Sequence, residues 1–377
     1  MHRMLNPTRW PALLPMSLVA LAVGALTGCG EPAAPPAATA NTVPAEPVLP
    51  PDPPGTPAGA DAWTADRIAV GDGLVMLRAG GTGTVGLSQA EIDWIVAAYG
   101  WPEKAAANAH SVTLAPYYIA ETELTNGQFA KFLEANPEYR TAQKDSKLVA
   151  HWKPAAEPAT LEGAHAGSGP AAAIVRQPVV YVARADAEAF AAWLTLSEQA
   201  AHRLPGGWAY RLPTEEEWEL AARGPDNTAA SQQTATATTE PRRRFPWGAE
   251  FKAENAWFGE SIAGQKLDAT SYFPWARGVK AKNTVDGVLL PNVQEVKTAK
   301  YYAGRSPVGC WHMAGNVWEW TAANDGEKAI AKGGSWWSPA PQLLISQRLV
   351  VDPAKPMPDV GFRLVAAPVA LVAPAAP

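Results

Sequence analysis

The pattern of apolar and polar positions predicts two strands in the first third of the chain. Residues 73–77 read Gly-Leu-Val-Met-Leu and are followed by Gly80 and Gly81, which predicts a strand that ends in a tight turn. Residues 111–119 combine Val, Thr, Tyr and Ile, and β-branched and aromatic residues of this kind favour strands. We therefore expect one strand in each stretch.

A helix is predicted to begin after Thr125. Thr125 fits the N-cap position and Gln128 the third helical position, so the two side chains can form a capping box. The residues that follow place Phe129 and Phe132 on one face, at the spacing of an amphipathic helix. The helix is expected to end before Pro137, because proline cannot continue it.

Two further helices follow from the same signals. Residues 185–198 carry Phe190 and Trp193 on an apolar stripe. Thr214 and Glu217 form the pattern of a second capping box. Three glutamates lie in the first turn of this last helix, where the helix dipole favours negative charge. That placement accounts for the acidic cluster, and we prefer this interpretation to a catalytic one.

The remaining segments show little periodicity. Residues 224–239 are rich in Thr, Ala, Gln and Ser and predict a surface loop. Residues 260–300 have no clear period and predict an irregular insertion. Because few segments are long and periodic, we expect a loop-rich α+β fold rather than a wound parallel sheet.

The N-terminus has the features of a secretory signal. Arg3 and Arg9 precede an apolar run at 13–26, which is too short to favour a permanent transmembrane helix. The run ends in Leu-Thr-Gly before Cys29, which resembles a bacterial lipobox and predicts a lipidated Cys29. An ordinary signal with an incidental cysteine is the alternative. Gly30 follows in place of the aspartate that favours retention in the inner membrane, so we expect an outer-membrane anchor.

Composition changes after the signal and again at the C-terminus. Residues 29–65 begin at the lipidated cysteine and consist mostly of Pro, Ala, Glu and Thr, which cannot bury a core and predict an extended tether. The predicted organisation is a signal peptide at 1–28, the tether at 29–65, one folded domain at 66–366 and a disordered tail at 367–377.

The cysteine count argues against a disulfide-stabilised domain, and the charge pattern argues against a nucleic-acid-binding protein. The chain has 2 cysteines, so lipidation of Cys29 leaves Cys310 without a disulfide partner. The net charge is −5 and the basic residues are scattered. The short run at 242–244 is too isolated to indicate nucleic-acid binding.

The C-terminal third contains an unusual run of aromatic, glycine and carboxylate positions. Residues 309–320 read Gly-Cys-Trp-His-Met-Ala-Gly-Asn-Val-Trp-Glu-Trp, and Gly-Gly-Ser and Gly-Phe-Arg follow. Together with earlier segments, these motifs resemble the formylglycine-generating enzyme family, also called sulfatase-modifying factor domains. The matching segments, in the family's order, are residues 117–119 with 123–129, 177–182, 210–218, 245–248, 315–320, 333–335 and 361–363.

The resemblance implies the family's irregular, loop-rich α+β fold, which is related to C-type lectins. In the oxidase branch of the family, two cysteines after Gly-Gly-Ser hold copper, because soft sulfur ligands stabilise Cu(I). In this sequence those positions are Ser338 and Leu343. Serine is a poor ligand for a soft ion and leucine is none, so we expect no copper and no copper-dependent formylglycine-generating activity.

Other branches keep an enzymatic interpretation open. The iron-dependent sulfoxide synthases use a His-x-x-x-His-x-Glu pattern that this chain lacks, although His110, His151, His165 and His202 could still converge in space. A periplasmic pyoverdine-maturation relative is associated with oxidative chemistry without the copper cysteines. An oxidoreductase that uses another metal is therefore the alternative hypothesis.

The resemblance also implies calcium sites, because Ca²⁺ prefers carboxylate and carbonyl oxygens. One site would use backbone oxygens of Gly315 and Val317 and the Glu319 carboxylate. Its fourth ligand, usually Asn or Asp, is His312 in this sequence, which weakens the site. The alternative for Glu319 is a buried carboxylate hydrogen-bonded to loop amides.

A second calcium site would use Asn255 and the carbonyl of Ala256. Its remaining ligands cannot be aligned.

Tryptophans suggest a binding surface or a packed core. Trp318 and Trp320 are expected in the core, whereas Trp336 and Trp337 lie where the copper loop would be and could serve either role. With Ser338 they form the candidate cleft. Arg348 and Arg363 are expected to pair with carboxylates inside the fold.

The sequence therefore favours a membrane-anchored lipoprotein of the cell envelope with a binding or scaffold role. Its ligand would be an envelope protein, a peptide or a small molecule. The alternative is an oxidoreductase of the same family that acts on a secreted peptide or small molecule. Convergent histidines or carboxylates near Ser338 would favour the enzyme, and a cleft filled by tryptophan rings would favour binding.

Overall fold

The computed structural model describes residues 56–57, 63–101, 107–142, 170–226, 242–285 and 288–369. The signal peptide, Cys29, most of the tether and most of the tail lie outside the described residues, as do His151 and His165 and most of the loop expected at 224–239. Within the described part of the chain, no helix is both long and apolar enough to cross a membrane.

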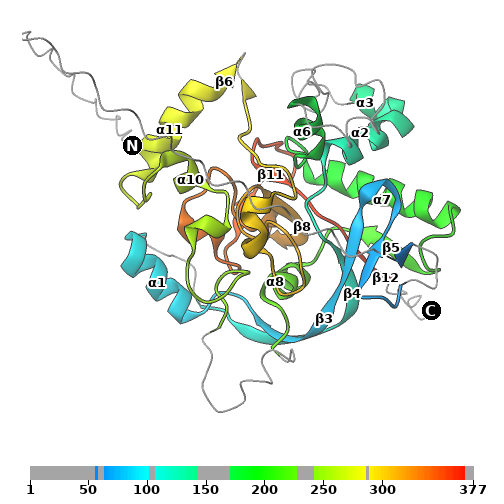
Figure 1. Cartoon of the computed structure of the whole chain (residues 1–377), viewed down its shortest axis with the longest axis horizontal. Helices are drawn as coiled ribbons and strands as arrows, with labels where there is room; N and C mark the ends of the chain where they lie inside the picture. The colour runs from blue at the N-terminus through cyan, green and yellow to red at the C-terminus, as the bar shows by residue number, and fades with distance from the viewer. Residues whose placement is uncertain are drawn as a thin grey trace, which may run out of the picture. The chain divides into compact units, whose positions relative to one another are not determined.

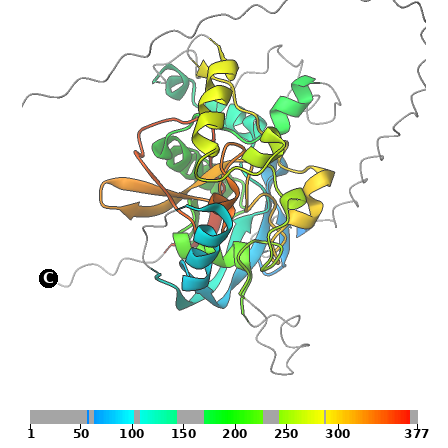
Figure 2. The same ribbon diagram turned by 90° about the vertical axis from the view of Figure 1, so that its left-hand side faces the viewer.

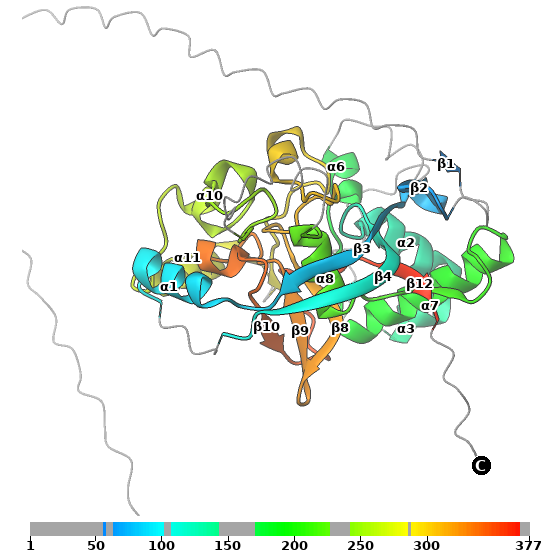
Figure 3. The same cartoon turned by 90° about the horizontal axis from the view of Figure 1, so that it is seen from below.

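A curled six-stranded sheet forms the centre of the fold (Figure 3). The two long strands, β3 and β4, pair antiparallel along most of their length. Strand β4 confirms the strand predicted at residues 111–119. The strand order is β1 (Thr56–Pro57), β2 (Arg67–Ala69), β3 (Val75–Val85), β4 (His110–Ala120), β12 (Val365–Pro368) and β5 (Trp208–Arg211). The C-terminal strand β12 thus lies between β4 and β5 and joins them in one sheet.

The prediction that the first strand ends at Gly80 and Gly81 is wrong. Strand β3 continues to Val85, with a register shift between Ala79 and Gly81 opposite β4. Gly80 has φ +124°, and a Cβ at this position would lie 2.9 Å from the carbonyl oxygen of Ala115. The glycines therefore form a bulge that bends the strand, because long-range pairing with β4 outweighs their local preference for a turn.

Helices cover one face of this sheet at its β5 end, where α2 (Asn126–Ala135), α3 (Pro137–Ala142), α6 (Pro170–Arg176) and α7 (Arg184–Ala200) gather (Figures 1 and 3). The capping box at α2 is confirmed, since the Thr125 side chain accepts a hydrogen bond from the backbone N–H of Gln128. Helix α7 confirms the predicted stripe, because Phe190 packs against Phe129 and Phe362 in the largest core cluster.

A second sheet carries the C-terminal motifs, with strand order β10 (Leu349–Val351), β9 (Lys328–Lys332), β8 (Trp318–Asp325) and β11 (Val360–Gly361). The tip of the β8–β9 hairpin is exposed and extends outward in orange in Figure 2. At the base of the hairpin, Trp318 and Trp320 are buried, as expected, and Glu319 pairs in parallel register with Gly361. This pairing brings the Gly-Asn-Val-Trp-Glu-Trp and Gly-Phe-Arg motifs together.

The insertion expected at residues 260–300 is more regular than predicted. It contains α10 (Gly259–Ala263), α11 (Tyr272–Asn283), the hairpin β6 (Thr284–Val285) and β7 (Val288–Leu289), and the 3-10 helix η4 (Ala299–Gly304). Figure 1 shows α11 at the edge of the domain beside α10. The remaining helices are α1 (Gln89–Tyr99), α8 (Glu215–Arg223) and the 3-10 helices η2 (Gly71–Gly73), η3 (Ala253–Asn255) and η5 (Ala340–Leu343).

Candidate functional site

The acidic cluster at the start of α8 belongs to the scaffold, as the sequence interpretation favoured. Thr214 caps the helix and accepts a hydrogen bond from the N–H of Glu217, and Glu217 pairs with Arg211 at 2.7 Å. Glu215 accepts a hydrogen bond of 2.6 Å from Arg348, which confirms the ion pair expected for that arginine. Each carboxylate of this cluster that is buried has a cationic partner.

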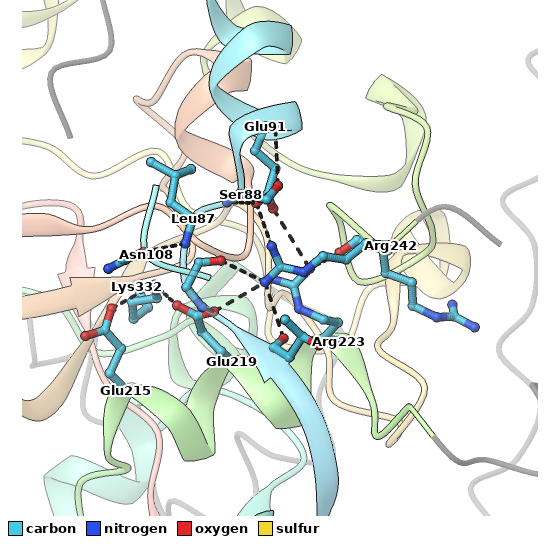
Figure 4. A network of polar contacts seen from close by, with 12 residues as sticks. Leu87, Ser88, Glu91, Asn108, Glu215, Glu219, Arg223, Arg242 and Lys332 are labelled. Atoms are coloured by element: carbon cyan, nitrogen blue, oxygen red, sulfur yellow. Dashed lines mark hydrogen bonds and ion pairs between the residues drawn. The ribbon is translucent and has the colours of Figure 1, made fainter. Parts of the chain in front are cut away.

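The ion pairs of α8 continue into a buried network (Figure 4). Lys332 is fully buried and donates to Glu219 at 2.7 Å. Arg223 lies 3.7 Å from Glu219 and 3.9 Å from Glu91, and Arg242 donates to Glu91 at 2.9 Å. The network links α8, β9 and the start of α1, so it fixes how the two sheets meet.

Burial perturbs the charges of this network unequally. Burial and then the neighbouring Arg242 lower the pKa of Arg223 to about 10. Burial alone would raise the pKa of Glu219, but Lys332 and Arg223 outweigh it and hold that pKa below its ordinary value. Glu219 and Arg223 are therefore both charged at neutral pH, and their contact serves as a structural connection.

A second buried charge centre lies between β8 and β11. Arg363 donates to both oxygens of Glu319 at 2.6 Å, and Trp218 donates its indole N–H to the same carboxylate at 2.7 Å. Both charged side chains are fully buried. The ion pair expected for Arg363 is confirmed, and its partner is the carboxylate that the resemblance assigned to calcium.

Two titratable groups adjoin this ion pair. Asn316 donates to the Glu123 carboxyl at 3.0 Å, and burial, followed by the charge of Glu319, raises the pKa of Glu123 well above its ordinary value. Burial and then the charge of Arg363 lower the pKa of His312 to about 3, so this ring is neutral near pH 7.

The residues at Glu319 do not fit calcium. Arg363 places a positive charge against both carboxylate oxygens, where a divalent cation would have to bind. His312 offers a ring nitrogen in place of the oxygen that calcium prefers. Glu319 is thus paired with Arg363 instead of a calcium ion. The same conclusion applies to Gly315 and Val317, whose carbonyls the resemblance assigned to that calcium site.

Asn255 and Ala256 lie in η3 and directly after it. Asn255 is mostly buried, and the Ala256 carbonyl accepts a hydrogen bond of 3.3 Å from Ser261. The backbone of Asn255 lies against Gly304 of η4, where no side chain would fit. Packing against Gly304 and the hydrogen bond from Ser261 therefore hold Asn255 and Ala256 in place, and the oxygen atoms belong to two adjacent residues.

The loop after Gly-Gly-Ser lacks a pair of soft ligands. Ser338 is buried, and its hydroxyl accepts a hydrogen bond of 3.1 Å from the N–H of Ser335. Leu343 is fully buried in an apolar cluster with Phe258 and Ala340. A Cβ at Gly334 would lie 2.9 Å from the carbonyl oxygen of Gln342, and its φ is +76°, so glycine is required for the loop to fold back on itself. The side chains present do not fit a copper ion.

A chain of polar groups lies in the same loop. The Ser335 hydroxyl donates to Asp359 at 2.8 Å, and the hydroxyls of Ser335 and Ser338 are 3.2 Å apart. Asp359 is partly exposed, and burial raises its pKa to about 6. In the part of the chain that the structure describes, the base hydrogen-bonded to these hydroxyls is this carboxylate, so the group is suited to hydrogen bonding rather than to forming a serine nucleophile.

Two stacked indoles adjoin this polar chain. The rings of Trp336 and Trp337 are 5.7 Å apart and nearly parallel, with Trp336 buried and Trp337 partly exposed. The backbone N–H of Trp337 donates to the Ser335 hydroxyl at 3.3 Å. Its indole N–H has no hydrogen-bond partner among the described residues. The structure thus brings together Ser338, Trp336 and Trp337 of the candidate cleft, and adds a carboxylate.

Of the histidines in the described ranges, none converges with this loop. His110 and His202 are exposed, on β4 and after α7, and His312 lies in the Glu319 centre. Over the described ranges, no group of three or more His, Cys, Asp or Glu side chains is placed to hold a metal ion. Burial raises the pKa of Cys310 to about 11, so this thiol is protonated.

Sequence reasoning missed Ser335 and Asp359 as members of the site. Asp359 lies two residues before the Gly-Phe-Arg segment, and its backbone oxygen accepts from the N–H of Trp318 at the start of β8. A search that also considered the residues flanking each motif could have identified Asp359 as a candidate. The contact with Ser335 depends on two segments 24 residues apart and has no local signal.

The fold and this site define a loop-rich α+β domain, with a buried ion pair beneath a polar and aromatic loop. The family model for the sulfatase-modifying factor enzyme 1-like domain matches residues 65–368. The chain belongs to this family, which confirms the resemblance seen in the sequence.

Curated relatives include active and inactive members. The formylglycine-generating enzyme of Streptomyces coelicolor is 29% identical over 276 residues, covering 68% of each chain. The inactive C-alpha-formylglycine-generating enzyme 2 of Mus musculus is 26% identical over 290 residues, covering 68% of this chain and 76% of that protein. The hercynine oxygenase of Mycobacterium tuberculosis is 24% identical over 259 residues, covering 60% of this chain and 47% of that protein.

Solved structures with a similar chain path include PvdO from Pseudomonas aeruginosa, with a TM-score of 0.43 and 23% identity, covering 78% of this chain and 95% of that one. Treponema denticola variable protein 1 has a TM-score of 0.41 and 18% identity, covering 78% and 94%.

Proposed function

We propose that this protein is a lipid-anchored binding or scaffold member of the sulfatase-modifying factor family that works in the cell envelope without copper. The observation that carries the proposal is the pair of positions 338 and 343. One holds a hydrogen-bonded serine and the other a leucine in an apolar cluster. The family scaffold around them is intact, and similarity to proteins named as inactive forms supports the same reading.

The polar loop suggests the chemistry of the ligand. Asp359 and Trp337 are both partly exposed and meet through Ser335. Among the described residues, no cation pairs with Asp359. A ligand with a cationic or hydrogen-bond-donating group beside an apolar surface would fit, because it would meet the carboxylate and the indole face together. An envelope peptide or protein segment with a lysine or arginine has this chemistry.

The absence of copper chemistry is tested directly with a sulfatase peptide. The purified full chain is incubated with copper, oxygen and a peptide carrying the sulfatase cysteine motif, with the Streptomyces coelicolor enzyme as positive control. We expect mass spectrometry to detect no formylglycine with this chain. Formylglycine above the enzyme-free background would contradict the proposal.

Anchoring through Cys29 is tested by fractionation. The Cys29→Ala chain should lose the lipid and its radiolabelled fatty acid, and native Cys29 should place the protein with the outer membrane. Incorporation of labelled fatty acid by the Cys29→Ala chain would disprove the anchor. Separation of inner and outer membranes on a density gradient tests the role assigned to Gly30.

Calcium at Asn255 and Ala256 belongs to the proposal, because the two residues are rigidly held oxygen donors. Added calcium should raise the Tm of the native chain, and Asn255→Ala should abolish that rise. A calcium response that is unchanged in Asn255→Ala would place the ion elsewhere.

The second candidate is an oxidoreductase that uses another metal. Similarity to hercynine oxygenases favours it. Elemental analysis of protein purified without chelators tests this candidate, since it requires a redox metal near one ion per chain.

A further inference from the structure

Helix α11 differs from the other long helices of the domain in having no buried residue. Phe273 is 56% exposed, and Arg277 and Lys280 are also exposed. These three residues are spaced i, i+4 and i+7, so they lie along one face of the helix. An aromatic side chain is thus presented to solvent in line with two cations.

Charge on α11 is of one sign. The helix contains Arg277, Lys280 and Lys282 and no acidic residue, although the net charge of the chain is −5. The aromatic end is extended by Trp101, whose ring lies 5.8 Å from Phe273. The basic end is extended by Leu290, which is 42% exposed and whose backbone N–H bonds to Asn283. Apolar and cationic groups therefore alternate along one surface, the α11 face.

The opposite side of α11 packs toward the candidate site. Val279 packs against the apolar cluster around Trp336, together with Val288 of β7 and Trp337. The ring of Trp275 lies against Gly259, whose N–H donates to the carbonyl oxygen of Ser338 at 2.8 Å. This side of the helix therefore packs beside the loop that holds Trp337 and Ser338, so whatever binds the α11 face lies close to that loop.

We propose that the α11 face docks on an anionic phospholipid surface. This inference rests on the proposed function, because the lipid on Cys29 brings the domain to a membrane. Exposed aromatic rings and basic side chains on one helix face are the composition of interfacial helices, whose rings enter the headgroup region while the cations meet phosphate groups. The charge of the helix favours an anionic lipid surface over a neutral apolar groove, because its three charged residues are all cations. Docking would place the Trp337 and Asp359 site next to the bilayer, where envelope peptides and lipid-linked molecules lie.

The test uses the native lipidated chain on two kinds of vesicle. One is an equal mixture of phosphatidylethanolamine and phosphatidylglycerol, and the other is phosphatidylcholine alone. Flotation establishes anchoring, and hydrogen exchange is then followed in the peptide that spans residues 272–283. We expect exchange there to be slower on the anionic vesicles than on phosphatidylcholine, and unchanged in β3 and β4.

Two double variants distinguish an effect of the α11 face from an effect of the overall charge of the protein. Arg277→Glu with Lys280→Glu should remove the difference between vesicles and weaken binding to anionic vesicles roughly thirtyfold, at about fivefold for each basic residue lost and with repulsion in addition. Lys328→Glu with Lys355→Glu changes the same charge at exposed positions of other elements and should keep the difference.

A chain that floats but shows equal exchange on both vesicles would overturn the inference, as would equal losses in the two double variants. Slowing that appears only after a protein extract is added would also overturn it, in favour of a protein partner. A chain that does not float contradicts the anchor alone, because the binding of the two double variants to anionic vesicles still tests α11.

Discussion

The Glu319–Arg363 centre and the loop from Ser335 to Leu343 lie close together in the C-terminal part of the chain, but they retain different parts of the family pattern. At the centre, each oxygen of a buried carboxylate accepts a hydrogen bond from a buried guanidinium. In the loop, the two positions that would need sulfur hold a hydroxyl and an isobutyl group. The buried ion pair and the two positions that the resemblance assigns to copper therefore involve different residues, so the two regions can be tested separately.

The largest expected effect comes from breaking the centre. Arg363→Met should leave Glu319 buried without its cationic partner and lower the free energy of unfolding by about 3–5 kcal/mol. Lys131→Met, which breaks the exposed pair with Asp72, is the control and should cost about 1 kcal/mol or less. Denaturant titration measures both. Equal costs would show that the Glu319–Arg363 pair does not support the fold.

His312 should make the centre sensitive to acid. Its pKa is about 3 when folded and about 6.5 when unfolded, so its contribution is complete above about pH 6.5 and is lost as the pH falls toward 3, by as much as about 4 kcal/mol. His312→Asn should therefore be more stable than the native chain at about pH 4.5 and close to it at about pH 7.5. Asparagine also tolerates the positive φ of 52° at this position.

The control for this prediction is His202→Asn, an exposed histidine that also has a positive φ, of 54°. It should leave the pH dependence unchanged. Identical pH profiles for the native chain and His312→Asn would mean that His312 is not buried as a neutral ring.

Leu343 provides the corresponding test in the loop, because its role there is apolar packing. Leu343→Ala should lower the free energy of unfolding by about 2–5 kcal/mol, because it leaves a cavity beside Phe258. Leu196→Ala, at a side chain that is 68% exposed, should change it by less than about 0.5 kcal/mol. Thermal and denaturant unfolding of the two variants provide the measurement, and similar values would contradict the assignment of Leu343 to the core.

The smallest expected effect is a gain. The pKa of Asp359 rises to about 6 in the folded chain, so its favourable contribution is complete below about pH 4 and is lost as the pH rises through 6. Asp359→Asn should therefore stabilise the protein at about pH 7.5, by at most about 3 kcal/mol and less to the extent that solvent reaches the group. The gain should be smaller at about pH 4.5. Asp325→Asn, at an exposed position, should show no such gain, and loss of stability in Asp359→Asn at both pH values would disprove the raised pKa.

The sequence predicted the elements whose signals are local. Thr125 with Gln128 and Thr214 with Glu217 carry the information for two helix starts within four residues, and both capping boxes are present. Helix α11 gave no such signal, because Ser271 makes no side-chain cap and none of its residues is buried to produce a stripe. The continuation of β3 through Gly80 could not be predicted, since it depends on pairing with a strand some thirty residues away.

The candidate site at Ser338, Trp336 and Trp337 stays a prediction, because these residues are consecutive in the chain and their proximity needs no fold. The partner of Glu319 could not be predicted, because its distance of 44 residues from Arg363 in sequence carries no periodic signal. Asp359 was missed for the same reason, as its role depends on the β8–β11 pairing that places it beside Ser335.

The most direct test of the central claim is the ligation of copper in the native protein. The chain is purified from its native host without chelators, saturated with Cu(I), and studied by elemental analysis and X-ray absorption. The account predicts substoichiometric copper that a mild chelator removes, with no sulfur in its coordination shell. One tightly held copper ion per chain with thiolate ligands would contradict it.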